Sequence, residues 1–191
     1  MQLVGVQLGQ ARKVLIGGRT VMTAIRKTEV SGPVAVRPLG LEGDEQVDLS
    51  VHGGLEKAVY AYPSEHYGFW LAQRAQAGVA GIDEQLPWGA MGENLTLSGL
   101  LETDVWVGDV LAFANCTLRV AQPREPCFKF NAAMGFNQAV KAMAQSGYCG
   151  FYLSVDQVGS VQAGEAFELH PGPRRVSIPE RFNAKMFKHM R

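Results

Sequence analysis

A cysteine in the second half of the chain lies in a segment that favours thiol chemistry. Cys127 follows Pro123 and Pro126, and the cations Arg124 and Lys129 lie within three residues of it. The thiolate is the reactive form of cysteine, and nearby cations stabilise that form. Each proline fixes its own φ angle, so the thiol is expected in a stiff loop. A buried cysteine acting as a small hydrophobe is the alternative, but the cations favour a functional thiol of unspecified chemistry.

A polar, glycine-rich cluster over residues 40–48 leads into a second candidate segment that contains His52. Gly53 and Gly54 follow that histidine, and paired glycines let backbone approach a ligand closely and present N–H groups to an anion. A histidine with an unperturbed pKa of about 6.5 can transfer a proton near neutral pH. A turn that carries a surface histidine is the alternative interpretation.

Two further polar residues are weaker candidates. Asn94 ends the irregular segment 89–94, which includes Gly92, and an asparagine side chain both donates and accepts hydrogen bonds. Lys27 ends the segment 23–27, and by its local sequence it is a solvated surface charge. Neither residue identifies a function alone.

Several common kinds of site are excluded by spacing. The three cysteines are odd in number and lack Cys-x-x-Cys spacing, so no disulfide framework or zinc knuckle is predicted. The four histidines show no paired metal-ligand spacing. The chain also lacks a phosphate-binding loop, a dinucleotide-binding glycine motif and the motifs of zinc proteases and serine hydrolases.

Charge and hydropathy exclude further classes of partner. The 18 basic and 18 acidic residues give a formal net charge of zero, so no overall field attracts nucleic acid or acidic lipid. Aromatic residues do not interleave with a basic stripe, which argues against nucleic-acid binding. No apolar run reaches the roughly 18 residues of a membrane span, and the N-terminus does not resemble a signal peptide. We therefore expect a cytoplasmic protein without a membrane partner.

Hydrophobic patterning predicts a mainly β fold. Short alternating or apolar runs predict strands over residues 3–8, 34–36, 58–62, 94–97, 105–107, 110–113 and 117–121. The turn at Gly108 and Asp109 predicts a hairpin or tight corner between two of them. Many short strands at this spacing indicate an antiparallel sandwich or barrel.

Helices and domain limits complete the expected architecture. Helical spacing predicts helices over residues 63–75 and 136–145, and a short amphipathic helix or a frayed tail over 178–191. The sequence Pro171-Gly172-Pro173 interrupts regular structure. One domain is thus expected over residues 1–170, followed by a basic tail over 171–191.

Six segments in this order resemble the MOSC family, named after the C-terminal domain of molybdenum cofactor sulfurase. They are residues 40–46, 51–54, 58–62, 92–95, 107–109 and 122–127, and the likeness spans about residues 3–169. The stand-alone bacterial YiiM-like group is the nearest match. The resemblance implies a β-rich α+β barrel with a few peripheral helices. It also implies binding of a molybdopterin-type molybdenum cofactor and reduction of N-hydroxylated compounds, such as detoxification of hydroxylaminopurines and other hydroxylamines.

The resemblance assigns catalytic roles to three residues. Cys127 corresponds to the family's cysteine and is expected to be a thiolate ligand of molybdenum, for which a soft sulfur donor is suitable. His52 and Lys27 correspond to a histidine and a lysine of the family. Either is expected to protonate the oxygen that leaves the substrate.

The resemblance also implies a cofactor-binding set. Arg124 and Asn94 are expected to hold the phosphate or the pterin, Arg124 by its bidentate fork. Gly53, Gly54 and Gly92 are expected to let backbone approach the cofactor. The region after Pro171 is shorter than in longer YiiM-like proteins. The substrate range and the oligomeric state therefore stay open, and a homodimer is one of the oligomeric states considered.

The expected partners are a small N-hydroxylated substrate and a separate electron-transfer protein. The latter follows because the chain has neither a flavin motif nor iron–sulfur cysteines. Two alternatives remain. In one, the domain carries the cofactor, or a persulfide on Cys127, without catalysis. In the other, Cys127 is the nucleophile of a hydrolase and His52 is its base.

Overall fold

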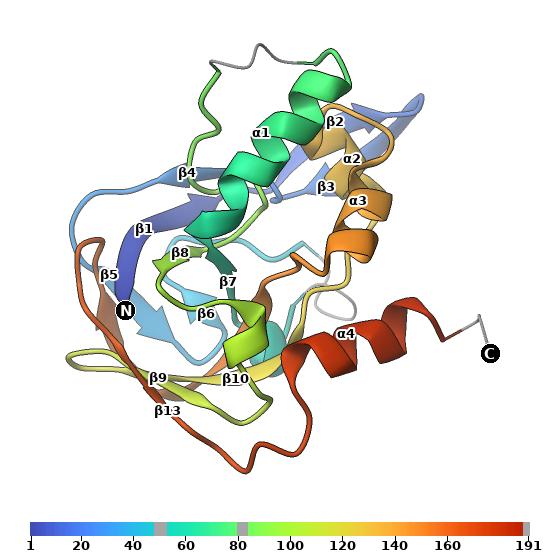
Figure 1. The fold of residues 1–191 in the computed structure, drawn as a ribbon. Helices are drawn as coiled ribbons and strands as arrows, with labels where there is room; N and C mark the ends of the chain where they lie inside the picture. Colours follow the sequence, from blue (N-terminus) through green and yellow to red (C-terminus); the bar gives the residue numbers. More distant parts are fainter. Residues whose placement is uncertain (48–52, 80–83, 189–191) are drawn as a thin grey trace.

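One large mixed sheet dominates the computed structural model, which describes residues 1–47, 53–79 and 84–188. Its strand order is β13-β9-β10-β11-β7-β8-β1-β4 (Figure 1). All its neighbouring strands pair antiparallel except β7 and β8, which are parallel. Its strands are β1 (Gln2–Gly9), β4 (Lys27–Glu29), β7 (Val59–Pro63), β8 (Leu95–Ser98), β9 (Val110–Ala112), β10 (Thr117–Pro123), β11 (Phe151–Gln157) and β13 (Glu168–His170).

Two small sheets and four α-helices surround the large sheet. One small sheet has the order β12-β5-β6, and the other is the hairpin β2–β3. Their strands are β12 (Gly159–Val161), β5 (Val34–Arg37), β6 (Gly40–Leu41), β2 (Arg12–Ile16) and β3 (Arg19–Thr23). The helices are α1 (Tyr67–Gln76), α2 (Phe128–Met134), α3 (Ala139–Ser146) and α4 (Ile178–Met186), with three short 3₁₀ turns, η1 (Leu55–Lys57), η2 (Ser64–His66) and η3 (Glu102–Asp104).

The mainly β class is confirmed, but the expected barrel is not closed by strand pairing. Within the described residues, the edge strands β13 and β4 do not pair with each other. Instead, the chain just before β13 lies along the start of β1. Leu3 N donates to Glu165 O at 2.9 Å, and Gly164 N donates to Leu3 O at 2.7 Å. The sheet therefore curls on itself through a few backbone bonds rather than a continuous ladder.

The prediction of a strand over residues 105–107 is wrong, because the backbone groups of this segment form hydrogen bonds outside any strand ladder. Trp106 forms only an isolated bridge with Ser177. The fully buried Asp109 carboxylate accepts hydrogen bonds from Trp106 N at 3.0 Å and Gly172 N at 2.6 Å. Gly108 and Asp109 thus form a tight corner that also fixes the C-terminal segment.

Several elements were not predicted from the sequence, among them the hairpin β2–β3, strand β11 and helix α2. The hairpin β2–β3 turns through Gly17 and Gly18, whose φ angles of 55° and 78° suit a two-residue hairpin turn. Helix α2 begins immediately after Cys127, so the segment expected to be a loop ends at a helix. The predicted helix over 136–145 begins later, at Ala139, and Gly147 ends it with a φ of 74°.

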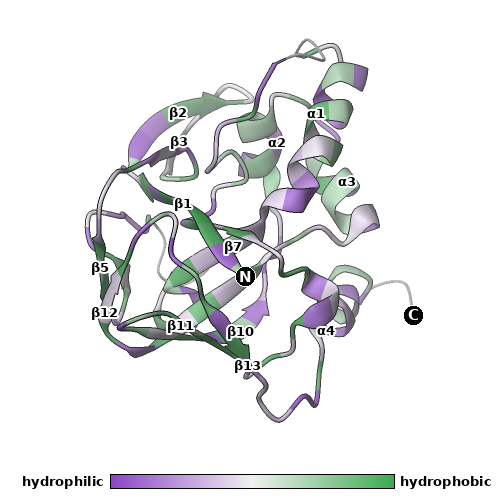
Figure 2. Cartoon of the chain, turned by 60° about the vertical axis from the view of Figure 1, so that its left-hand side comes forward, coloured by the Kyte–Doolittle hydropathy of each residue, from purple (hydrophilic) through white to green (hydrophobic). Residues whose placement is uncertain are grey.

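The core lies between the large sheet and the helices. Figure 2 shows that β1 is largely hydrophobic, and its Leu3 and Val6 are fully buried. From the helices, Trp70 of α1 and Phe130 of α2 pack together with ring centroids 5.2 Å apart. No helix among the described residues has both the length and the apolar character needed to cross a bilayer.

The C-terminal segment is part of this core. Helix α4 begins with a capping box in which Ser177 and Glu180 bond to each other's backbone N–H groups. Its Ile178 and Phe182 are almost completely buried. The helix packs against β10, the strand that leads to Cys127.

Phe182→Ala tests whether α4 contributes to the fold. Removing a buried aromatic side chain leaves a cavity, so we expect a loss of about 3–5 kcal/mol in the free energy of unfolding. Denaturant unfolding followed by circular dichroism measures it. The exposed neighbour Asn183 provides the control, because Asn183→Ala should change stability by less than about 0.5 kcal/mol. Equal stability of both variants would show that the tail is separable.

Candidate functional site

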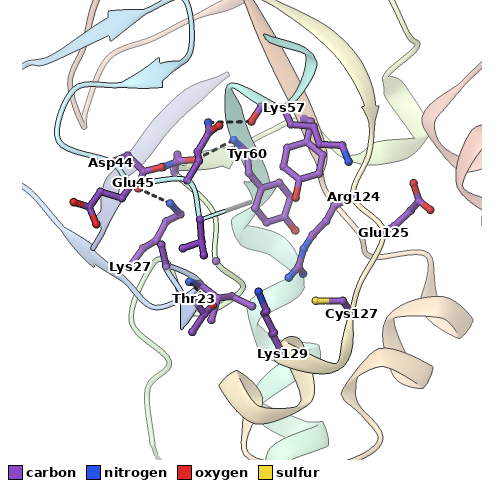
Figure 3. A pocket seen from close by; sticks show the side chains of 17 residues that line it. Thr23, Lys27, Asp44, Glu45, Lys57, Tyr60, Arg124, Glu125, Cys127 and Lys129 are labelled. Atoms are coloured by element: carbon purple, nitrogen blue, oxygen red, sulfur yellow. Dashed lines mark hydrogen bonds and ion pairs between the residues drawn. The ribbon is translucent and has the colours of Figure 1, made fainter. Parts of the chain in front are cut away.

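One pocket brings together residues from six parts of the chain. It lies where the start of β4, the end of the hairpin and the segment from β10 into α2 approach each other (Figure 3). The lining residues are Thr23, Ala24, Ile25, Lys27, Asp44, Glu45, Gln46, Val47, Lys57, Tyr60, Gly92, Asn94, Arg124, Glu125, Cys127, Lys129 and Tyr152. Five of the eight site residues predicted from the sequence are among them.

Cys127 stands at the junction of strand β10 and helix α2. It is the N-cap residue of α2, with extended backbone angles, and its carbonyl oxygen accepts a hydrogen bond from Phe130 N at 2.8 Å. The residue is partly exposed. In Figure 3 its sulfur and the nitrogen atoms of Arg124 and Lys129 point toward the same space. A thiol in this position can reach a ligand in the pocket.

Arg124 is a buried cation, only 5% exposed. Its guanidinium lies over the rings of Phe130 and Tyr60, with its central carbon 4.6 and 5.1 Å from their centroids. Burial lowers its pKa, but Tyr60 and Tyr152 oppose this effect and the pKa stays above its ordinary value. Among the described residues, no carboxylate forms an ion pair with Arg124. A buried guanidinium without a carboxylate is a strong site for an anion.

Lys27 lies on the opposite wall of the pocket and is paired with Asp44. Lys27 Nζ and Asp44 Oδ1 are 2.5 Å apart, and the two side chains are 7% and 5% exposed. The same carboxylate oxygen accepts a hydrogen bond from Gly9 N at 2.6 Å. Burial lowers the pKa of Lys27 below its ordinary value, although Asp44 opposes the shift. The interpretation of Lys27 as a solvated surface charge is therefore wrong.

Asn94 and Gly92 line the pocket but also hold the strands together. Asn94 Oδ1 accepts a hydrogen bond from Tyr60 N at 3.1 Å, and its Nδ2 donates to Gln7 O at 3.2 Å. The side chain thus links β7 to β1 and retains one amide hydrogen for a ligand. Gly92 has a φ of 87°, and a Cβ there would lie 2.9 Å from Ile25 Cγ1. Glycine is therefore required for both conformation and space.

The remaining predicted residues are placed differently. Neither Gly53 nor Gly54 is among the residues that line the pocket. Gly54 has a φ of 88° and precedes η1, and its N–H donates to Gln46 Oε1 at 3.1 Å. Gln46 itself lines the pocket, so Gly54 lies behind it. His52 falls outside the described residues, and its role remains a prediction.

Two tyrosines of the pocket were not predicted as site residues. The rings of Tyr60 and Tyr152 are 5.2 Å apart at their centroids, on the paired strands β7 and β11. Burial raises the pKa of both hydroxyl groups, and the charge of Arg124 opposes this. Both therefore stay protonated at neutral pH, and the Tyr60 hydroxyl donates its hydrogen to Cys149 O at 2.8 Å. Alternation over residues 151–157 was the signal that could have located β11.

Helix α4 reaches back to the cysteine segment. Lys185 Nζ donates to Gln122 Oε1 at 3.0 Å and forms an ion pair with Glu125. Gln122 belongs to β10 and Glu125 lies two residues before Cys127. The C-terminal helix thus helps to fix the segment that carries the thiol.

The donor set limits the kind of metal that the pocket could hold. Within the described residues, no group of three or more His, Cys, Asp or Glu side chains could hold a metal ion. Cys127 is therefore the single soft donor of the described pocket, beside a buried cation. Such a set suits a metal whose other ligands come from an anionic cofactor rather than a metal held by protein alone.

Comparisons with known proteins agree on one family. Residues 48–168 match the MOSC domain. The protein YflK of Bacillus subtilis (strain 168) is 36% identical over 177 residues, which is 92% of this chain and 76% of that protein. A protein named "Reductase" from Gibberella moniliformis is 32% identical over 172 residues, which is 90% of this chain but 29% of that protein. The crystal structure of YiiM from Geobacillus stearothermophilus has a TM-score of 0.76 and 33% identity, covering 98% of this chain and 84% of that one.

Lys27→Met tests whether the buried ion pair is a structural unit. The change leaves the Asp44 carboxylate buried without its cation, so we expect a loss of about 3–5 kcal/mol in the free energy of unfolding. The double variant Lys27→Met/Asp44→Asn removes the orphaned charge and keeps an oxygen for Gly9 N, so it should recover most of that loss. Denaturant unfolding at neutral pH measures both. No recovery in the double variant would contradict the pairing.

Proposed function

Because the chain belongs to the MOSC domain family, we propose that it binds a molybdopterin-type molybdenum cofactor and reduces N-hydroxylated compounds. The observation that carries the proposal is the pocket in which the Cys127 thiol lies beside the buried Arg124. The family's association with the molybdenum cofactor and a relative named "Reductase" support it.

The residues of the pocket fit such a cofactor. Cys127 would ligate the metal as a thiolate, which binds in its deprotonated form. Arg124 would bind the phosphate or a pterin oxygen, since its charge is buried without a carboxylate partner in the described residues. Lys129 adds a second cation beside it (Figure 3). Gly92 lines the same pocket, where a Cβ would meet Ile25.

The proposed reaction consumes two electrons and two protons: R–NHOH + 2 e⁻ + 2 H⁺ gives R–NH₂ + H₂O. When bound, the cofactor supplies the two electrons that break the N–O bond. In this proposal Lys27, which lines the pocket, gives a proton to the departing oxygen. Burial lowers its pKa, so that it releases the proton more readily than a surface lysine. His52 remains the second proposed proton donor.

The aromatic wall suits a flat substrate. Tyr60 and Tyr152 both line the pocket, with their ring centroids 5.2 Å apart. Aromatic pairs favour offset or tilted contacts with another ring. A hydroxylaminopurine would make such contacts, whereas a small aliphatic hydroxylamine would not.

Cys127→Ala tests the metal ligand. We expect protein purified without oxygen from cells that make the cofactor to contain about one molybdenum per chain, and the variant to lose most of it. Inductively coupled plasma mass spectrometry measures the metal. Cys116→Ala is the matched control, because that thiol is buried and its pKa is raised to about 11, which keeps it protonated.

Two results of this experiment would contradict the reductase. One is an equal molybdenum content in the Cys127→Ala variant and the wild type. The other is an extra sulfur atom on Cys127, seen by intact-mass spectrometry, in protein that contains no molybdenum. The second result would instead support a persulfide carrier.

The pH dependence of turnover tests the role of Lys27. A general acid must be protonated, so the rate should be present below the pKa of Lys27 and fall as pH rises through it. Burial places that fall at a lower pH than the ordinary lysine value of about 10.4. Lys27→Arg cannot release its proton in this range and should lower kcat about 10²–10⁴-fold. A full rate in Lys27→Arg, at equal molybdenum content, would exclude Lys27 as the acid.

A further inference from the structure

The chain is neutral overall, but its charges are not evenly distributed. Residues 1–28 contain five lysines and arginines and no acidic residue. Residues 126–155 contain Lys129 and Lys141 and again no acidic residue. These two stretches include the hairpin β2–β3 and the helices α2 and α3.

The structure brings the two stretches together. Figure 1 shows the hairpin beside α2, and Lys129 Nζ donates a hydrogen bond to Met22 O at 3.1 Å. A groove lies between them, which we call the basic groove. It is lined by Arg12, Val14, Ile16, Thr23, Ile25, Arg26, Lys129, Ala132 and Ala133. Three cations thus surround an aliphatic floor, and no acidic side chain from the described part of the chain lines this groove.

Strand register explains why the groove has this composition. Side chains alternate along β2, so Arg12, Val14 and Ile16 share one side and face α2. Figure 2 shows the hydrophilic start of β2 followed by hydrophobic residues. At the base of the hairpin, the carboxylate of Glu45 accepts a hydrogen bond from Ala11 N at 2.6 Å. Among the described residues, none of the groove's cations, Arg12, Arg26 and Lys129, forms an ion pair.

The basic groove joins the pocket that contains Cys127. Thr23, Ile25 and Lys129 line both hollows. A protein seated in the groove would therefore lie directly beside the site where reduction takes place.

The proposed reduction needs electrons that this chain does not supply itself. The described residues and the sequence contain no motif for a flavin or an iron–sulfur cluster. In the relative named "Reductase", the matched region is 29% of the protein, so most of that chain lies outside it. Under the proposed function, the electrons come from a carrier that lies outside these 191 residues.

We propose that the basic groove is the docking surface for an acidic electron-transfer protein that delivers electrons to the Cys127 pocket, an inference that rests on the proposed reductase function. Two one-electron carriers are oxidised for each N–O bond reduced to an amine and water. Weak redox encounters use small interfaces, and opposite charge steers them. The aliphatic floor and the cationic rim fit an acidic protein better than nucleic acid, because no aromatic side chain lines the groove for base stacking.

The test compares two charge-reversal variants of the molybdenum-loaded protein. Arg12→Glu/Arg26→Glu changes the groove, and Arg37→Glu/Arg175→Glu changes the same amount of charge at exposed residues outside it. Each is assayed with reduced [2Fe–2S] ferredoxin, an acidic carrier, and with reduced methyl viologen, a small reductant that needs no docking surface. Binding of ferredoxin is also measured by calorimetry at low and high salt.

We expect the groove variant to lose at least tenfold in kcat/KM for ferredoxin at low salt and to keep its rate with methyl viologen. The loss should shrink as salt screens the charges, and the control variant should behave like the wild type. Equal ferredoxin efficiency in both variants would overturn the proposal. The proposal would also be overturned if the protein bound a single-stranded oligonucleotide through Arg12 and Arg26 but did not bind ferredoxin.

The two proposals can fail separately. If the wild type turns over no substrate even with methyl viologen, the reductase function is wrong. Ferredoxin binding then tests by itself whether the basic groove is a docking surface. If the wild type binds ferredoxin in a salt-sensitive way and Arg12→Glu/Arg26→Glu does not, the docking surface is supported. If the wild type does not bind ferredoxin, the docking surface is excluded.

Discussion

A buried positive charge is the constraint on which the rest of the site depends. Arg124 is enclosed by the rings of Tyr60 and Phe130, yet no carboxylate among the described residues neutralises it. A charge in such a place costs free energy unless a partner binds it. The fold tolerates this cost at Arg124, which lies three residues before Cys127. The buried cation and the thiol together give the pocket its chemistry.

The fold supplies the elements that hold this arrangement. Strand β10 ends at Pro123, helix α2 starts after Cys127, and the short connection between them carries Arg124. Helix α4 fixes the connection from outside, because Lys185 contacts both Gln122 and Glu125. On the facing wall, the pairing of Gly9 with Lys27 places the buried ion pair with Asp44. The same wall continues into the hairpin and the basic groove.

Much of this could be predicted from the sequence, and the failures have physical reasons. Six of the thirteen strands in the described residues, β1, β5, β7, β8, β9 and β10, followed from their short apolar or alternating runs. The family resemblance brought Cys127, Arg124 and Lys27 into one hypothesis. The burial of Lys27 could not be predicted, because Asp44 lies 17 residues away and its partnership depends on the pairing of β1 with β4. The prediction of a strand at Trp106 was wrong because the backbone N–H of Trp106 donates to the Asp109 carboxylate. The hydrophobic pattern of the sequence does not show this hydrogen bond.

The most direct test of the central claim is a crystal structure of the anaerobically purified protein with anomalous data at the molybdenum edge. The account predicts one anomalous peak in the pocket, beside the sulfur of Cys127, with an anionic group of the cofactor against the guanidinium of Arg124. A peak elsewhere in the molecule, or a pocket without one in protein shown to contain molybdenum, would contradict it.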